Sequence, residues 1–251
     1  MRLNRVVEYD AARRKTRMRI DVPKRLFNVD DYYRMADVGI LGPEDRVELI
    51  DGEIIQMSPI GTRHAGCVTW VNRAFTLAFR GRAVVSVQNP LRLNKYTEPE
   101  PDVVLLKYRD DDYRDKRMTS EDTLLVVEVA ETTLRYDRDI KVPRYAAAGV
   151  PEVWIQDLKG DRLLVYRDPD PKGFQTSLIL KRVESVYAQA FPEVAFTIDE
   201  LLGGLLTALR SPTKIWAANC ANDANGPQRI PVVTNGINGV RPIRVIRAIR
   251  G

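Results

Sequence analysis

The stretch LLVVEVA at residues 124–130 decides the fold. Six of its seven residues are apolar, and this pattern predicts a strand that is buried on both faces. A second apolar run, DVVLL at residues 102–106, precedes it and predicts another strand. Glu128 lies inside the first run and Asp102 begins the second. Each strand therefore places one carboxylate in apolar surroundings.

The rest of the chain mixes helical and strand patterns around these two runs. Asp51-Gly52 lies between two apolar runs and predicts a hairpin, because a type I′ turn needs positive φ at both central residues. The polar segment 108–122 predicts an exposed loop. Other strands are expected at 83–87, 153–156, 163–166 and 174–180, and helices at 28–38, 63–79, 137–148 and 198–206. This mixture predicts an α/β (α+β) fold with a mixed central sheet flanked by helices.

The net charge of +5 comes from the ends of the chain. Residues 1–29 carry nine Lys or Arg and three Asp or Glu, and residues 212–251 carry six and one. The residues between them carry 24 basic and 30 acidic side chains. We expect a flexible basic arm at 1–23, a single domain at 24–210 and a disordered basic tail at 211–251.

Composition excludes several classes of protein. Two cysteines are too few for a disulfide framework, and the single histidine, His64, excludes a multi-histidine zinc site within one chain. No run approaches 18 apolar residues, and the basic N-terminus lacks the apolar segment of a secretory signal. A membrane partner is therefore not expected, and the cytoplasm is the expected location.

Asp102 and Glu128 are the candidates for chemistry. Two carboxylates on neighbouring buried strands repel each other unless a cation lies between them, and Mg²⁺ prefers oxygen ligands. An ion pair of Glu128 with Arg135 or Arg138 at the end of its strand is the alternative on residue type alone. The two interpretations remain open at this level.

The helix expected after Glu128 carries Asp137, Lys141 and Tyr145 at intervals of four, which places them on one helical face. An ordinary surface pair of Asp137 with Lys141 would have the same spacing. Pro143 complicates the geometry because it removes a helical hydrogen bond. Either the helix kinks there, or it begins near Val142.

Six motifs in order resemble those of the Uma-type bacterial proteins, which are restriction-endonuclease-like nucleases of the PD-(D/E)XK superfamily. They are ELIDGEI (48–54), His64, PEPDVVLL (99–106), VVEVAETT (126–133), DRDIK (137–141) and YAAAGVPEVWIQD (145–157). The resemblance covers about residues 28–205. It implies a four-stranded mixed sheet with the metal-binding acids on two adjacent central strands.

The resemblance also implies roles for individual residues. Asp102 and Glu128 would be the metal-binding acids, with the carbonyl of Val129 as a further ligand and Glu48 completing the site. The usual lysine position, two residues after the acid, is Ala130 here, so the resemblance points to Lys141 instead. Tyr145 would fix Lys141 or touch a phosphate. His64 and Gln88 are weaker candidates for contact with substrate.

The resulting prediction is a nuclease that uses Mg²⁺ or Mn²⁺ to hydrolyse phosphodiester bonds, with DNA as its partner. Cleavage of both strands by this class generally requires two sites and hence a homodimer. A nuclease-like module that binds nucleic acid or protein without cutting is the alternative, since the usual lysine is missing and the body is acidic. A metal-free hydrolase with paired carboxylates, such as a glycosidase, explains Lys141 less well.

Overall fold

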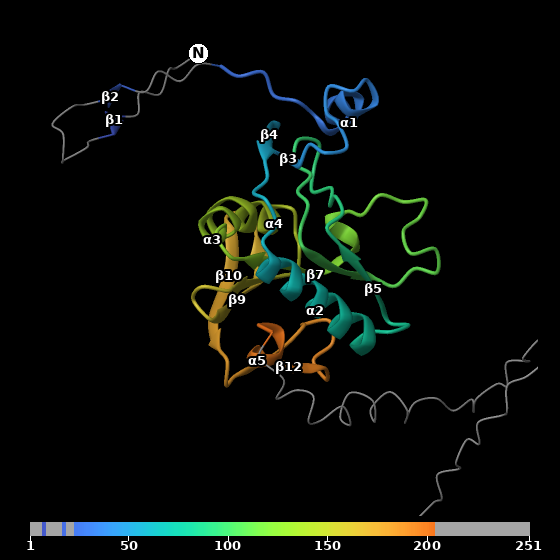
Figure 1. Ribbon diagram of the computed structural model, residues 1–251, viewed down its shortest axis with the longest axis vertical. Helices are drawn as coiled ribbons and strands as arrows, with labels where there is room; N and C mark the ends of the chain where they lie inside the picture. Colours follow the sequence, from blue (N-terminus) through green and yellow to red (C-terminus); the bar gives the residue numbers. More distant parts are fainter. Residues whose placement is uncertain (1–6, 9–16, 19–22, 204–251) are drawn as a thin grey trace, which may run out of the picture. The chain divides into compact units, whose positions relative to one another are not determined.

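The computed structural model describes residues 7–8, 17–18 and 23–203 (Figure 1). The expected tail at 211–251 and most of the expected arm at 1–23 lie outside these residues. Within the arm, β1 (Val7–Glu8) pairs with β2 (Arg17–Met18). Among the described helices, none has the length and hydropathy that crossing a membrane requires.

A six-stranded mixed sheet forms the centre of the fold. Its order is β10 (Gly173–Lys181), β9 (Arg162–Asp170), β8 (Glu152–Asp157), β7 (Thr123–Ala130), β6 (Val103–Lys107) and β5 (Ala83–Val87). β7 and β8 pair in parallel, and every other neighbouring pair is antiparallel. The sequence-based expectation of a mixed sheet is confirmed, although the sheet has six strands rather than four. The LLVVEVA run forms the interior strand β7, which explains why both of its faces are apolar.

Helices cover both faces of the sheet. The first face packs against α2 (Thr62–Ala78) and α5 (Ile198–Leu201), with Phe75 and Trp154 in its core. The second face packs against the connection from β7 to β8, with Tyr145 and Ile155 in its core. This connection contains α3 (Leu134–Tyr136), the π-helical turn η2 (Asp137–Lys141) and α4 (Val142–Ala147).

Pro143 explains the π-helical turn. A proline inside an α-helix lacks its N–H and clashes with the carbonyl four residues earlier. Here it lies at the start of α4, directly after the wider turn η2. The connection therefore remains helical through the proline, and the interval-of-four pattern survives: Asp137, Lys141 and Tyr145 are all buried.

A hairpin and a capped helix lie at the end of the sheet where the site forms. The N-cap Asn28 begins α1 (Val29–Asp37), as expected from its sequence. The hairpin joins β3 (Val47–Ile50) to β4 (Glu53–Gln56), and its turn residues Asp51 and Gly52 have φ of 50° and 79°. The predicted Asp-Gly turn is thus confirmed.

The segment 108–122 is less exposed than expected. It ends in the short 3-10 helix η1 (Ser120–Asp122), and Tyr113 buries its ring against the second face of the sheet. The Tyr113 hydroxyl donates to the carbonyl of Lys107 at 2.9 Å. The mostly polar sequence of this segment gave no indication that Tyr113 would be buried in the core. A further two-stranded ribbon, β11 (Ser185–Tyr187) with β12 (Ala195–Thr197), lies before α5.

Gly52→Ala should destabilise the protein by about 1–3 kcal/mol. A Cβ at Gly52 would stand 2.7 Å from Leu26 Cβ, in addition to the strain of positive φ. Gly39→Ala is the matched control, because Gly39 has φ of 75° but no atom within 4 Å of an added Cβ. Urea denaturation should therefore show a larger loss for Gly52→Ala. Equal losses would contradict the close approach at the hairpin.

Candidate active site

Asp102 stands where the ladder between β6 and β7 ends. Pro101 lacks an N–H, and the last paired residues of this ladder are Val103 and Val127. The carboxylate of Asp102 then accepts the N–H of Val129 through Oδ2 at 2.8 Å. The Pro-Asp dipeptide therefore closes the ladder with a side chain and fixes Asp102 at the edge of β7.

Glu128 is buried inside β7, with 2% of its surface exposed. Its Oε1 accepts a hydrogen bond from the Tyr145 hydroxyl at 2.6 Å and one from Lys141 Nζ at 3.2 Å. The alternative of an ion pair with Arg135 or Arg138 is wrong: among the described residues Glu128 forms its ion pair with Lys141, and Arg138 pairs with the exposed Asp139. Glu128 therefore depends on groups from the helical connection behind its strand.

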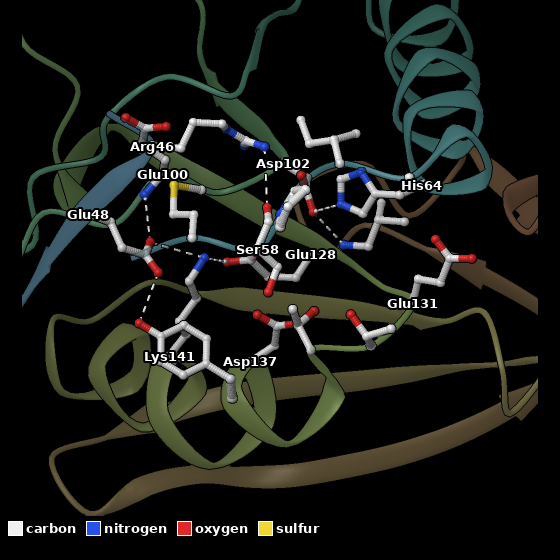
Figure 2. A pocket seen from close by; sticks show the side chains of 18 of the residues that line it. Arg46, Glu48, Ser58, His64, Glu100, Asp102, Glu128, Glu131, Asp137 and Lys141 are labelled. Carbon is white, nitrogen blue, oxygen red and sulfur yellow. Dashed lines mark hydrogen bonds and ion pairs between the residues drawn. The ribbon is translucent and has the colours of Figure 1, made fainter. Parts of the chain in front are cut away.

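Glu48 approaches the same lysine from β3. Its Oε2 lies 3.2 Å from Lys141 Nζ and accepts the N–H of Glu100 at 3.1 Å. Its Oε1 accepts the Tyr136 hydroxyl at 2.9 Å. Figure 2 shows the Lys141 ammonium between Glu48 and Glu128, which come from separate strands.

His64 and Gln88 both contact Asp102. His64, in the first turn of α2, places Nε2 3.0 Å from Asp102 Oδ2. Gln88, which follows β5, donates to Asp102 Oδ1 at 3.3 Å. The structure thus brings together all eight residues named from the sequence: Glu48, His64, Gln88, Asp102, Glu128, Val129, Lys141 and Tyr145.

The sequence-based set omitted three neighbours. Asp137 lines the cavity and binds the Thr133 hydroxyl, while Tyr136 and Glu100 hold Glu48. The interval of four residues between Asp137 and Lys141 could have indicated that Asp137 faces the same cavity as Lys141. The contacts of Tyr136 and Glu100 depend on where the hairpin lies against the helical connection, and no local pattern encodes that placement.

The cluster holds more acid than its buried cation can balance. Burial raises the pKa of Glu128 to about 8, and the nearby Asp137 and Asp102 add to this effect against the opposing attraction of Lys141. Burial likewise raises the pKa of Asp137 to about 6. Burial disfavours the Lys141 ammonium, but the charges of Glu128, Glu48 and Asp137 outweigh it and raise the pKa of Lys141.

These groups line a cavity of about 350 Å³. Within the described part of the chain, no three His, Cys, Asp or Glu side chains converge closely enough to hold a metal ion. A set made of Asp102, Glu128 and the Val129 carbonyl contains two such side chains and one backbone oxygen. Its all-oxygen chemistry and its excess of buried acid fit a hard divalent cation.

The comparisons with known proteins agree with this fold. The family model Uma2, described as "Putative restriction endonuclease", matches residues 29–199. Among solved structures, the chain is similar to the crystal structure of "a putative nuclease belonging to DUF820" from Anabaena variabilis ATCC 29413. The TM-score is 0.55 at 15% identity, and the match covers 72% of this chain and 99% of that one. No curated protein matches the chain.

Without metal, the protein should lose stability as pH rises from about 5 to about 8. The folded state holds protons on Glu128 and Asp137 that the unfolded chain releases near their ordinary values of 4.5 and 3.8. The folded state therefore binds more protons in this window, so stability falls with pH. The hydrogen bond to Asp102 raises the pKa of His64, which acts in the same direction.

Thermal unfolding in EDTA at several pH values measures this slope. Glu128→Gln should flatten it, because the amide does not titrate. Asp139→Asn is the matched control, since Asp139 is exposed on the same helical connection and its pKa is lowered by Arg138. A slope that Glu128→Gln leaves unchanged would contradict the assignment of the buried proton.

Proposed function

Because the chain belongs to the Uma2 family of putative restriction endonucleases, we propose that it is a metal-dependent endonuclease that hydrolyses phosphodiester bonds in DNA. The observation that carries the proposal is the buried acid cluster around Lys141 at the end of the interior strands β6 and β7. An acid cluster with raised pKa values, open to a cavity, is typical of a functional site.

Asp102, Glu128 and the Val129 carbonyl would hold Mg²⁺ or Mn²⁺. Glu48 would bind a second metal ion or a metal-bound water. A bound divalent cation supplies an activated water and neutralises charge on the phosphate. The chain itself orients these ligands. Val129 N–H, His64 and Gln88 fix Asp102, and Tyr145 fixes Glu128.

Lys141 acts as a cation rather than as a base in this proposal. Its raised pKa keeps the ammonium protonated at neutral pH, so it cannot accept a proton from water. Glu48 and Glu128 hold the ammonium in place from two sides, each at 3.2 Å. It would stabilise negative charge that develops on the phosphate, or orient the attacking water.

Binding of DNA must overcome repulsion from residues 30–211, which carry 30 acidic and 24 basic side chains. The basic ends at 1–29 and 212–251 carry the excess positive charge. At the cavity itself, Arg46 lines the rim and donates to the carbonyl of Ser58 (Figure 2). Cleavage of both strands would generally require a homodimer, since the described residues of one chain form one such cluster.

Replacing the central residues should abolish nicking of supercoiled plasmid in Mg²⁺ or Mn²⁺. We expect Asp102→Asn, Glu128→Gln and Lys141→Met each to lower the rate by at least about a hundredfold, as removal of an electrostatic group at a reacting centre does. Asp139→Asn should cut at the rate of the unchanged protein. Retention of full activity by all three site variants would overturn the proposal.

Divalent metal should raise the melting temperature of the protein, more so at pH 8 than at pH 6. At pH 8 the carboxylates have fewer protons for the metal to displace, and binding to the folded state stabilises it. Differential scanning fluorimetry with Mg²⁺, Mn²⁺ or Ca²⁺ measures this shift. Asp102→Asn should remove it, and Asp139→Asn should retain it.

A nuclease-fold module that binds without cutting is the second candidate. Its support is the double ion pair of Lys141, which satisfies the ammonium inside the protein, and the absence of three convergent ligand side chains among the described residues. The fluorimetry separates the two candidates. No shift with any of the three metals, together with no nicking, would favour the binding module.

A further inference from the structure

A second cavity of about 290 Å³ is lined by Glu98, two residues before Glu100 of the candidate active site. Tyr33 of α1, Ser86 of β5 and Arg117 of the 108–119 loop line it, together with Glu98. We call it the Glu98 cavity. The segment 98–102 lines both cavities, because Glu100 and Asp102 face the candidate active site.

Glu98 has one carboxylate oxygen without a partner. The side chain is 2% exposed, and its Oε1 accepts the Tyr33 hydroxyl at 2.6 Å. Its Oε2 is buried and accepts no hydrogen bond from any described residue. An unsatisfied buried acceptor costs about 1–3 kcal/mol, so the oxygen requires a donor that residues 23–203 do not supply.

Two cations, Lys116 and Arg117, line the Glu98 cavity together with Asp112. Arg117 is exposed, and its guanidinium lies 3.9 Å from the centroid of the Tyr33 ring. No ion pair to Arg117 occurs within residues 23–203, whereas the adjacent Lys116 is paired with Asp122. The Arg117 guanidinium is therefore free to bind an anion.

Two charged groups of the cavity define the ligand. The Glu98 carboxylate selects hydrogen-bond donors, and the Arg117 guanidinium selects an anion. The Tyr33 ring, which contacts both groups, suits a flat ligand ring. A nucleotide combines these features. Guanine offers two adjacent N–H donors on one edge, whereas thymine offers one. One guanine donor would reach the unpartnered Oε2 of Glu98, and the other would share Oε1 with the Tyr33 hydroxyl, since a carboxylate oxygen can accept two hydrogen bonds. The cavity is at the small end of ligand pockets, near 300 Å³, and suits a single base.

We propose that the Glu98 cavity binds one guanine base of the strand that is cleaved at the neighbouring site; the proposal rests on the nuclease function proposed above. Pro99 and Pro101 keep Glu98 and Glu100 extended. At about 3.1 Å per residue, four residues from Glu98 to Asp102 span about 12 Å. The preferred guanine therefore lies within about four nucleotides of the cut, at 3.4 Å per stacked nucleotide.

Fluorescence anisotropy with the single-stranded probes d(TTGTT) and d(TTTTT), in EDTA so that no cleavage occurs, tests the cavity directly. The full chain should bind the guanine probe at least about fivefold more tightly, as expected for a well-made pair to a base edge. Equal affinities for the two probes would overturn the proposal, and this comparison requires no variant.

Three variants locate the effect. Glu98→Gln should reduce the preference for guanine to less than twofold. Arg117→Gln should weaken both probes equally and keep the preference, because it removes an anion contact rather than a base contact. Glu44→Gln is the matched control, since Glu44 is exposed and outside both cavities. A preference that survives in Glu98→Gln would overturn the assignment of the carboxylate.

Cleavage of an oligonucleotide library in Mn²⁺ separates this proposal from the nuclease function. The unchanged chain should show guanine enriched at one position within about four nucleotides of the cut, and Glu98→Gln should lose this enrichment. Cleavage with no base preference would overturn the guanine site and leave the nuclease function standing. Guanine-selective binding that depends on Glu98, with no cleavage of any substrate, would overturn the nuclease function and leave the guanine site standing.

Discussion

The carboxylate of Glu128, buried inside an apolar strand, is the constraint on which the site depends. A charge in that position is costly unless hydrogen-bonding and charged groups surround it. Tyr145 and Lys141 supply the donors, and Glu48 shares the lysine from a second strand. The protonation of each member therefore depends on the others, and a cation that enters the cavity acts on all of them together.

The connection between β7 and β8 makes this arrangement possible. Parallel strands need a helical crossover, so the helix that follows Glu128 must pack back over its own strand. The π-helical turn before Pro143 keeps this crossover continuous and directs Asp137 and Lys141 toward the cavity. A lysine two residues after the acid would lie on β7 itself. Here the ammonium comes from the crossover and reaches the same carboxylate.

The sequence predicted what local patterns encode. Strand β7, the Asp-Gly hairpin and the capped helix α1 followed from periodicity and turn chemistry, and the family resemblance selected the residues that the fold brings together. The π-helical turn was not predictable, because Pro143 alone allows either a kink or a new helix start. The roles of Tyr136 and Glu98 were hidden for another reason: each depends on contacts between segments far apart in the chain.

The parallel ladder between β7 and β8 also affects how the protein folds. Glu128, Lys141 and Tyr145 belong to one strand–helix–strand unit, whereas Glu48 and Asp102 come from earlier in the chain. The local unit can form with modest loss of loop entropy, and docking of the earlier hairpin requires closure of a much longer loop. We therefore expect the pairing of Glu48 with Lys141, which closes this longer loop, to form after the local unit.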